Sequence, residues 1–328
     1  MRKTFIEKLI TPNIFTIFLL FFCYAGVWAF TFFTGGKVVD EIEHFSPAAQ
    51  FLQSFFGQDE LIPSLLSFFI CILNIFLLIA LNNRFTLIRT RTILPVIVFL
   101  MLICGSQYPQ TLFLNHFALT LFIVSLFFFF NTYRDPKAVE QAYMGSFLIA
   151  CTSIIVPHYM LMIIACWITF FDYKAFSART FLASVFGLLT PLILYFSCLF
   201  LVNGTVDFQQ YLTYFLPYET IFNKGNLPLG TVYQVIMFLF FVPCAITVYL
   251  HFNKDVIHTR KNLNFCFFIL LFSIVLRAFY VNSYISLMPL TMLGYAVFLS
   301  HTFTLIQTKF WQIVFVLFCL INILFIFY

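Results

Sequence analysis

Long apolar runs recur along the whole chain and constrain its fold more than any other feature. Residues 14–33, 64–81, 111–130 and 181–202 are each long enough to cross about 30 Å of hydrocarbon at 1.5 Å per residue. Hydrophobic residues make up 62% of the sequence and charged residues only 9%, whereas soluble domains average roughly half and about a quarter. A water-soluble fold has no means of burying so much apolar surface. The sequence therefore predicts an all-α, polytopic transmembrane helical bundle.

The apolar runs predict about eleven spans in a single integral-membrane domain, residues 1–328. Two longer segments between them, residues 35–62 and 203–230, are predicted to be outer loops. No internal repeat and no soluble domain is visible along the chain. The predicted spans are residues 14–34, 63–83, 92–107, 111–131, 143–156, 159–171, 180–202, 231–252, 263–281, 284–306 and 311–328.

The basic residues are distributed unevenly between the two sides that these spans define. With the N-terminus in the cytoplasm, all but Lys37, Lys224 and Arg277 of the 17 Lys and Arg residues fall on the cytoplasmic side. Membrane proteins keep their basic residues on that side, and the opposite orientation would reverse the pattern. The sequence predicts a multi-pass protein of the inner (cytoplasmic) membrane with a cytoplasmic N-terminus.

Three predicted spans, residues 92–107, 143–156 and 159–171, are short. Their helices of about 13–16 residues cover only about 20–24 Å. Charged residues fix their inner ends, so the deficit is expected on the outer side. The turns at 107–110 and at Pro157–His158 would then lie below the outer surface and leave a concavity, which the two longer outer loops would cover. Local thinning of the bilayer or tilting of the helices is the alternative.

An acidic cluster directly follows the first span, although most of the chain avoids charge. Asp40, Glu41 and Glu43 lie within four positions, and His44 follows them. On a helix, Asp40, Glu43 and His44 would share one face. Carboxylates beside an imidazole can bind a divalent cation or act as a general base. A solvated loop without chemical function is the alternative, and both interpretations remain open.

Arg277 lies near the outer end of an apolar run. A charge at the bilayer centre costs about 2.5–3.5 kcal/mol on insertion scales, so such residues are often functional. Near a helix end, however, a long basic side chain can extend to the interface while its stem stays buried. A ligand-binding role and an interfacial role are both consistent with the sequence.

Tyrosines and histidines provide the remaining candidate positions. Tyr211, Tyr214 and Tyr218 would form one stripe on a helix, which could stack on sugar rings or belong to an interfacial aromatic belt. His116 and His158 lie toward the outer side, where each could reach a cavity. A histidine in a membrane span, His301 included, is more often a hydrogen-bond partner between helices.

Several classes of function are disfavoured because their signatures are absent from the sequence. No Gly-rich phosphate loop and no HExxH motif occurs. The span centres carry no paired acids of the kind that couple transporters to ions. No basic surface interleaved with aromatic residues indicates nucleic acid. The nine cysteines all fall in apolar segments without a CxxC pair, so we expect neither a disulfide framework nor a metal site from them.

Two segments resemble the polytopic C-type glycosyltransferases, which use lipid-linked sugar donors. The first is the Asp40-Glu41 pair in the first outer loop, followed by an amphipathic segment and the second span. The second is Arg277-Ala278-Phe279-Tyr280, followed by a helix that contains Pro289. The resemblance implies a C-type fold in which the acidic residue of the first outer loop is catalytic.

The same resemblance assigns roles to individual residues. Asp40 would act as general base or metal ligand, with Glu41 and Glu43 in support. Arg277 would hold the phosphate of a polyprenyl-phosphate sugar donor, for which a planar guanidinium is well suited. Tyr280 would contact the substrate. A divalent cation is the only cofactor that these residues indicate.

A further resemblance, over most of the chain, is to an uncharacterised family of Bacteroidota inner-membrane proteins. It implies the same location but no activity. The similar elements are Asn82-Asn83-Arg84-Phe85, Asn115-His116-Phe117-Ala118-Leu119, Val156-Pro157 and Leu188-Leu189-Thr190-Pro191.

The leading hypothesis is therefore a glycosyltransferase-like membrane enzyme that uses a lipid-linked donor at the outer face. Its expected partners are membrane lipids and a polyprenyl-phosphate sugar donor, and not nucleic acid. The alternative is a non-catalytic membrane subunit that contacts proteins of a cell-envelope complex. A transporter is a third hypothesis.

Overall fold

All regular structure in the described part of the chain is helical. The computed structural model describes residues 14–33, 46–56, 61–88, 92–106, 113–203, 229–279, 286–305 and 308–327. Within these ranges there is no strand. The predicted all-α class is confirmed.

Each predicted span coincides with a helical segment in the structure. The boundaries agree within a few residues for most of them. The segments are α2 (Ile14–Phe33), α3 (Pro47–Phe56), α4 (Leu61–Phe85), α5 (Leu94–Gly105), α6 (Phe113–Asn131), α7 (Val139–Ile155), the 3-10 helix η2 (Pro157–Met162), α8 (Ile163–Asp172), α9 (Ala178–Asn203), α11 (Leu229–Leu250), the 3-10 helix η4 (Phe252–Lys254), α12 (Ile257–Phe279), α13 (Met288–Leu305) and α14 (Lys309–Phe327).

Six helices in the described ranges are long and apolar enough to cross a membrane: α4, α6, α9, α11, α12 and α14. Apolar but shorter helices are found in α2, α5, α7 and the η2–α8 segment. The structure thus fits a multi-pass membrane protein. The count of eleven crossings stays a prediction.

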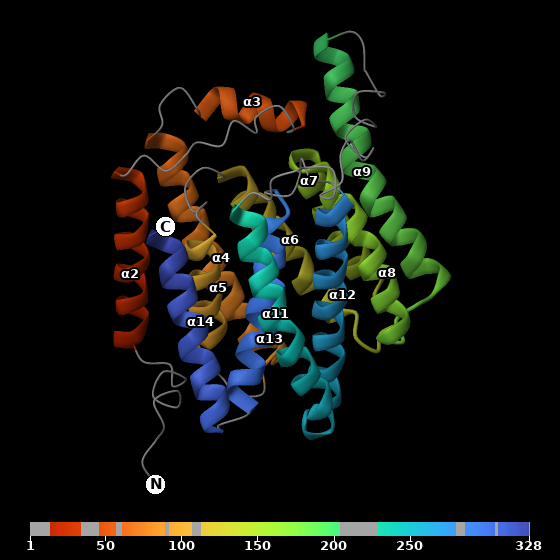
Figure 1. Ribbon diagram of the computed structural model, residues 1–328. Coiled ribbons are helices and arrows are strands. Elements are labelled where there is room, and N and C mark those ends of the chain that lie inside the picture. Colours follow the sequence, from red (N-terminus) through yellow and green to blue (C-terminus); the bar gives the residue numbers. More distant parts are fainter. Residues whose placement is uncertain are drawn as a thin grey trace.

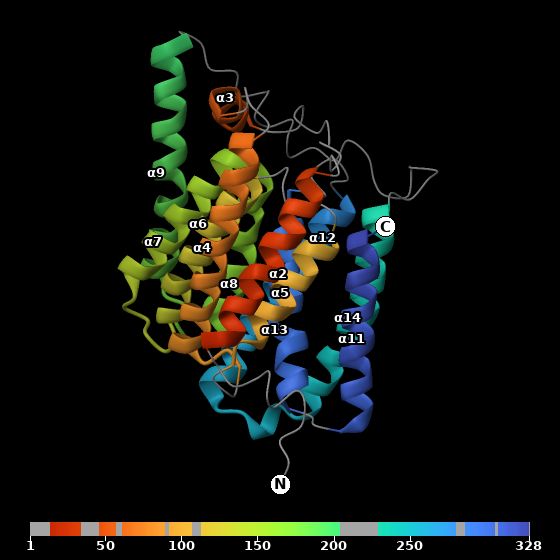
Figure 2. The same ribbon diagram turned by 90° about the vertical axis from the view of Figure 1, so that its left-hand side faces the viewer.

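The long helices run side by side along one axis (Figure 1). The start of α2 and the end of α14 lie at opposite ends of this bundle, and α3 lies across the end at which α14 finishes. We call this the α3 end. Figure 2 shows α3 end-on and shows that α9 extends beyond the other helices at the α3 end.

Helix α13 lies at the centre of the bundle and packs against α5, α11 and α12. Every residue from 287 to 303 is buried, as expected for a helix that is surrounded by protein. A Cβ atom at Gly294 would lie 2.9 Å from Leu270 of α12. Glycine at this position therefore permits the close approach of the two helices.

Basic residues collect at the end of the bundle opposite α3. Of the ten Lys and Arg residues in the described ranges, only Arg277 lies near the α3 end. The others are in or beside the ends of helices at the opposite side, as the predicted topology requires. They are Arg84, Arg134, Lys137, Lys174, Arg179, Lys254, Arg260, Lys261 and Lys309.

One boundary differs clearly from the prediction. The sequence predicts a span from residue 263, whereas α12 begins at Ile257. Its polar first turns are stabilised by neighbouring helix ends. The Thr259 hydroxyl donates to the carbonyl of Thr86 at 3.0 Å, and the Asn262 amide donates to the carbonyl of Phe85 at 3.0 Å. The helix can therefore extend past its apolar part because its polar side chains have partners.

Candidate functional site

Most of the site residues predicted from sequence lie outside the described residues. The structure describes four of the candidate positions, Arg277, His116, His158 and His301. The predicted site residues outside the described ranges are Asp40, Glu41, Glu43, Tyr211, Tyr214, Tyr218 and Tyr280.

Arg277 is in the last turn of α12, and its side chain is directed into the bundle. The residue is only 5% exposed, and Nη1 donates a hydrogen bond of 2.9 Å to Oγ1 of Thr291 on α13. The hydroxyl of Thr291 in turn donates to the carbonyl of Met288 at 2.8 Å, which leaves its oxygen lone pairs for the guanidinium. This placement disfavours an interfacial role, since that role would expose the charge. A ligand-binding role stays a prediction.

His158 lies in η2, at the turn between α7 and α8, and is 3% exposed. Val156 is in an extended conformation, with φ −122° and ψ 98°, because a residue that precedes proline disfavours the helical region. Pro157 therefore ends α7 and begins η2. The next residue, Tyr159, packs its ring against Phe122 of α6 with a centroid distance of 5.6 Å.

Along the bundle axis, the Pro157–His158 turn does not extend as far toward the α3 end as the neighbouring end of α6 does. A Cβ atom at Gly145 of α7 would lie 2.8 Å from the Phe129 ring of α6, so these residues share one height. From there α7 continues ten residues to Ile155 (145 to 155), whereas α6 extends sixteen residues back to Phe113 (129 to 113). The difference of six residues corresponds to about 9 Å. The turn is recessed relative to α6, and its depth in a bilayer stays a prediction.

Helix α3 covers this recess. Ser46, directly before α3, donates from its hydroxyl to the carbonyls of Ile154 and Ile155 at the end of α7, the latter at 3.1 Å. The same oxygen accepts from the backbone N–H of Ala49 at 3.2 Å, which is the usual bond of a serine N-cap. Ser46 therefore both begins α3 and ties it to α7. For residues 46–56, the structure places α3 against the end of α7; that this segment belongs to an outer loop stays a prediction.

Opposite faces of α3 have different environments. Ala49 is fully buried, whereas Phe51 and Phe55 are 69% and 72% exposed. A helix that lies across the end of a membrane bundle and exposes aromatic side chains on one face is typical of a helix in the membrane interface.

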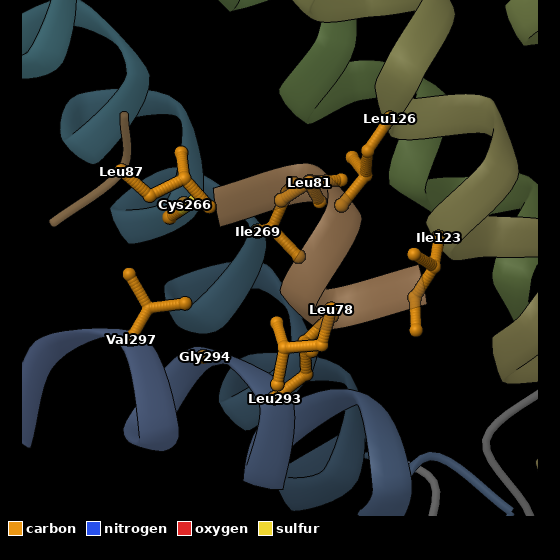
Figure 3. Close-up of a pocket in the computed structure, with 10 residues that line it drawn as sticks. All are labelled: Leu78, Leu81, Leu87, Ile123, Leu126, Cys266, Ile269, Leu293, Gly294 and Val297. Atoms are coloured by element: carbon orange, nitrogen blue, oxygen red, sulfur yellow. The ribbon is translucent and has the colours of Figure 1, made fainter. Parts of the chain in front are cut away.

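Helices α4, α6, α12 and α13 meet at a small cavity of about 20 Å³ (Figure 3). The residues that line it lie at about the same level along the bundle axis. Ile269 of α12 and Ile123 of α6 both line it. Arg277 is eight residues beyond Ile269 (269 to 277), or about 12 Å toward the α3 end. His116 is seven residues before Ile123 (123 to 116), or about 10 Å toward the same end. Arg277 and His116 therefore lie at nearly the same height.

A buried hydrogen bond between a histidine and a carboxylate near the opposite end was not predicted. His301 Nε2 of α13 lies 3.1 Å from Oδ2 of Asp255, in the turn before α12, and both side chains are fully buried. The prediction that His301 is a hydrogen-bond partner is confirmed, but its partner is a carboxylate. Forty-six residues separate the two positions, so no local sequence signal indicates the pair.

An apolar groove of about 510 Å³ lies between α2, α5 and α14. No residue of α12 or η2 lines it, so it is separate from Arg277 and His158. Residues that line it include Leu20, Val27, Leu100, Phe315 and Ile323.

The cysteines and other metal-binding side chains provide no centre in the described ranges. All nine cysteines are free. In the same ranges, no group of three or more His, Cys, Asp or Glu side chains could hold a metal ion. The acidic cluster that indicated a divalent cation lies outside them.

No protein-family model, no curated protein and no solved structure matches this chain.

Proposed function

We propose that this protein is an integral-membrane enzyme that transfers a sugar from a polyprenyl-phosphate donor at the α3 end of the bundle. The observation that carries the proposal is Arg277, a buried guanidinium near that end. A cation inside a membrane span is costly and is usually retained for function. Away from bulk water, a guanidinium binds phosphate through strong charge-assisted hydrogen bonds.

The surroundings of Arg277 support a site that is entered from the α3 end. His116 lies at about the height of Arg277, and the recessed Pro157–His158 turn is covered by an interfacial helix. A lipid-linked substrate enters from the membrane, where its headgroup lies at this level. The chain order of α2, an acidic segment, α3 and α4 resembles the first outer loop of C-type glycosyltransferases.

The distribution of charge supports an outward-facing site. The basic residues opposite α3 are expected to lie in the cytoplasm, and this expectation supports an α3 end that faces the outer side of the inner membrane. In this proposal Asp40 acts as general base or metal ligand, and Glu41 and Glu43 support it. The donor phosphate binds Arg277.

Substitution of Arg277 tests the phosphate-binding role. In nanodiscs, wild-type protein is expected to bind a polyprenyl phosphate more tightly than the matching polyprenol, by native mass spectrometry. Arg277→Gln should weaken phosphate-lipid binding about 10- to 100-fold, because a hydrogen bond to a charged group contributes about 1.5–3 kcal/mol. Arg277→Lys should recover part of the affinity, and polyprenol binding should not change.

The matched control is Lys309→Gln, which removes a basic residue that is exposed at the opposite end of the bundle. This variant should bind both lipids as the wild type does. Equal binding of polyprenyl phosphate and polyprenol by the wild type, or unchanged phosphate-lipid binding by a folded Arg277→Gln protein, would refute the proposal.

A further inference from the structure

Two adjacent side chains in the first turn of α6 are buried with unsatisfied polar atoms. Asn115 is fully buried, and neither its amide nitrogen nor its amide oxygen has a hydrogen-bond partner within the described structure. His116 is 2% exposed, and its Nδ1 also has no partner there. An unsatisfied buried polar group costs about 1–3 kcal/mol. Groups of this kind call for an explanation, such as a functional role.

The backbone that carries these side chains is firmly held. The carbonyl of His116 accepts from the Asn74 amide of α4 at 3.0 Å and from the Thr120 hydroxyl at 2.9 Å. Thr120 also donates to the Asn74 oxygen at 2.8 Å. Asn74 is thus satisfied in the interior, while Asn115 is not. The unsatisfied atoms are therefore presented by a rigid element.

Helical periodicity places the two side chains toward the candidate site. Asn115 precedes Phe122 by seven residues and shares its face, and Phe122 packs against Tyr159 of η2. Asn115 therefore lies on the face of α6 that is directed toward η2, and it lies two turns closer to the α3 end than Phe122. The hydroxyl of Tyr159 is buried and also without a partner among the described residues. His116 shares the face of Ile123 and is directed toward the seam with α12 and α13.

The chemistry of these groups fits a neutral, hydroxyl-bearing ligand. An amide and an imidazole each both donate and accept hydrogen bonds, and so does a sugar hydroxyl. The charged phosphate of the donor would bind Arg277, which lies at nearly the same height as His116. We propose that Asn115 and His116 form a subsite that binds the sugar of the lipid-linked donor. This assignment rests on the proposed function.

Asn115→Leu tests the subsite with two probes, a polyprenyl phosphate and the same lipid carrying one hexose. The variant should bind the hexose-bearing lipid about 5- to 30-fold more weakly, since loss of one or two hydrogen bonds removes about 1–2 kcal/mol. Its affinity for the bare polyprenyl phosphate should not change. Its thermal stability should be equal or higher, because an apolar side chain of similar size replaces an unsatisfied amide. His116→Phe should weaken the hexose-bearing lipid in the same way.

Asn322→Leu is the matched control. Asn322 of α14 is also fully buried, but its oxygen accepts from the Tyr233 hydroxyl at 2.7 Å and its nitrogen donates to the carbonyl of Phe318 at 2.8 Å. This variant should lose stability and keep the wild-type preference between the two lipids.

The outcomes separate the subsite from the proposed function. If the wild type binds neither lipid, the proposed function fails and the subsite fails with it. If the wild type binds both lipids with equal affinity, or if Asn115→Leu and His116→Phe both retain a preference for the hexose-bearing lipid, the subsite alone is refuted. Lower stability of Asn115→Leu with an unchanged preference would show a structural role and would also overturn the assignment.

Discussion

Asp40→Asn is expected to lower the rate of sugar transfer about 100- to 10,000-fold, the range typical for loss of a general base. The amide keeps the volume of the carboxylate but can neither accept a proton nor bind a hard cation well. The free energy of unfolding should change by less than about 0.5 kcal/mol, as for most loop substitutions. Complementation of a deletion strain, with protein levels measured by immunoblot, provides the test.

Glu41→Gln is to be measured together with Asp40→Asn, because either acid of the Asp40-Glu41 pair can act as the catalytic base. If Glu41 is the base, Glu41→Gln shows the large decrease in the rate of sugar transfer and Asp40→Asn stays active. Full complementation by both variants at normal expression would remove the catalytic role of the acidic segment. It would favour a solvated loop.

His301→Leu is expected to destabilise the protein by about 1–3 kcal/mol, the usual cost of removing the hydrogen-bond partner of a buried polar group. The substitution leaves the Asp255 carboxylate in a fully buried position without the imidazole that lies 3.1 Å from it. Because α13 is the central helix, the damage should spread to the whole bundle. Denaturation of the purified protein in mixed micelles would measure the loss.

A double-mutant cycle with Asp255→Asn isolates the pair. In the Asp255→Asn background, His301→Leu should cost less, with a coupling free energy in the range of about 0.5–3 kcal/mol. Additive effects of the two substitutions would show that the contact contributes no stability of its own. An unchanged stability of His301→Leu would refute the prediction outright.

The helices could be predicted from the sequence because membrane spans are defined by local properties. A run of about 20 apolar residues bounded by charge indicates one span without reference to its neighbours. This is why α6 (Phe113–Asn131) and α9 (Ala178–Asn203) lie within a few residues of their predicted positions. The predicted start of α12 is wrong because Thr259 and Asn262 bond to backbone carbonyls at the end of α4 and directly after it. A local sequence pattern cannot show these bonds.

The packing of the helices could not be predicted in the same way. The sequence indicates that α13 is apolar, as are the other spans, but not that it is the central helix. Likewise, Ser46 appears as one polar residue in a loop, whereas in the structure it ties α3 to the end of α7. Such roles depend on which segments meet in space. One loop and one helix end, more than a hundred residues apart, meet at this contact.

The candidate site was only partly accessible to sequence reasoning. Arg277 was conspicuous as a charge in an apolar run, and the structure adds its burial and its bond to Thr291. The sequence does not single out Asn115 as a site residue, because a single asparagine in a span is usually satisfied by a neighbouring helix, as Asn74 and Asn322 are. Its unsatisfied amide becomes apparent only when every neighbouring group has been placed.

The most direct test of the central claim is the pool of lipid-linked sugars in a strain that lacks this protein. Mass spectrometry of the extracted lipids should show accumulation of one polyprenyl-phosphate sugar, because its consumer is missing. Wild-type protein should restore the normal level, and Arg277→Gln at equal abundance should not. A pool that is identical with and without the protein would contradict the proposal that it uses a lipid-linked sugar donor.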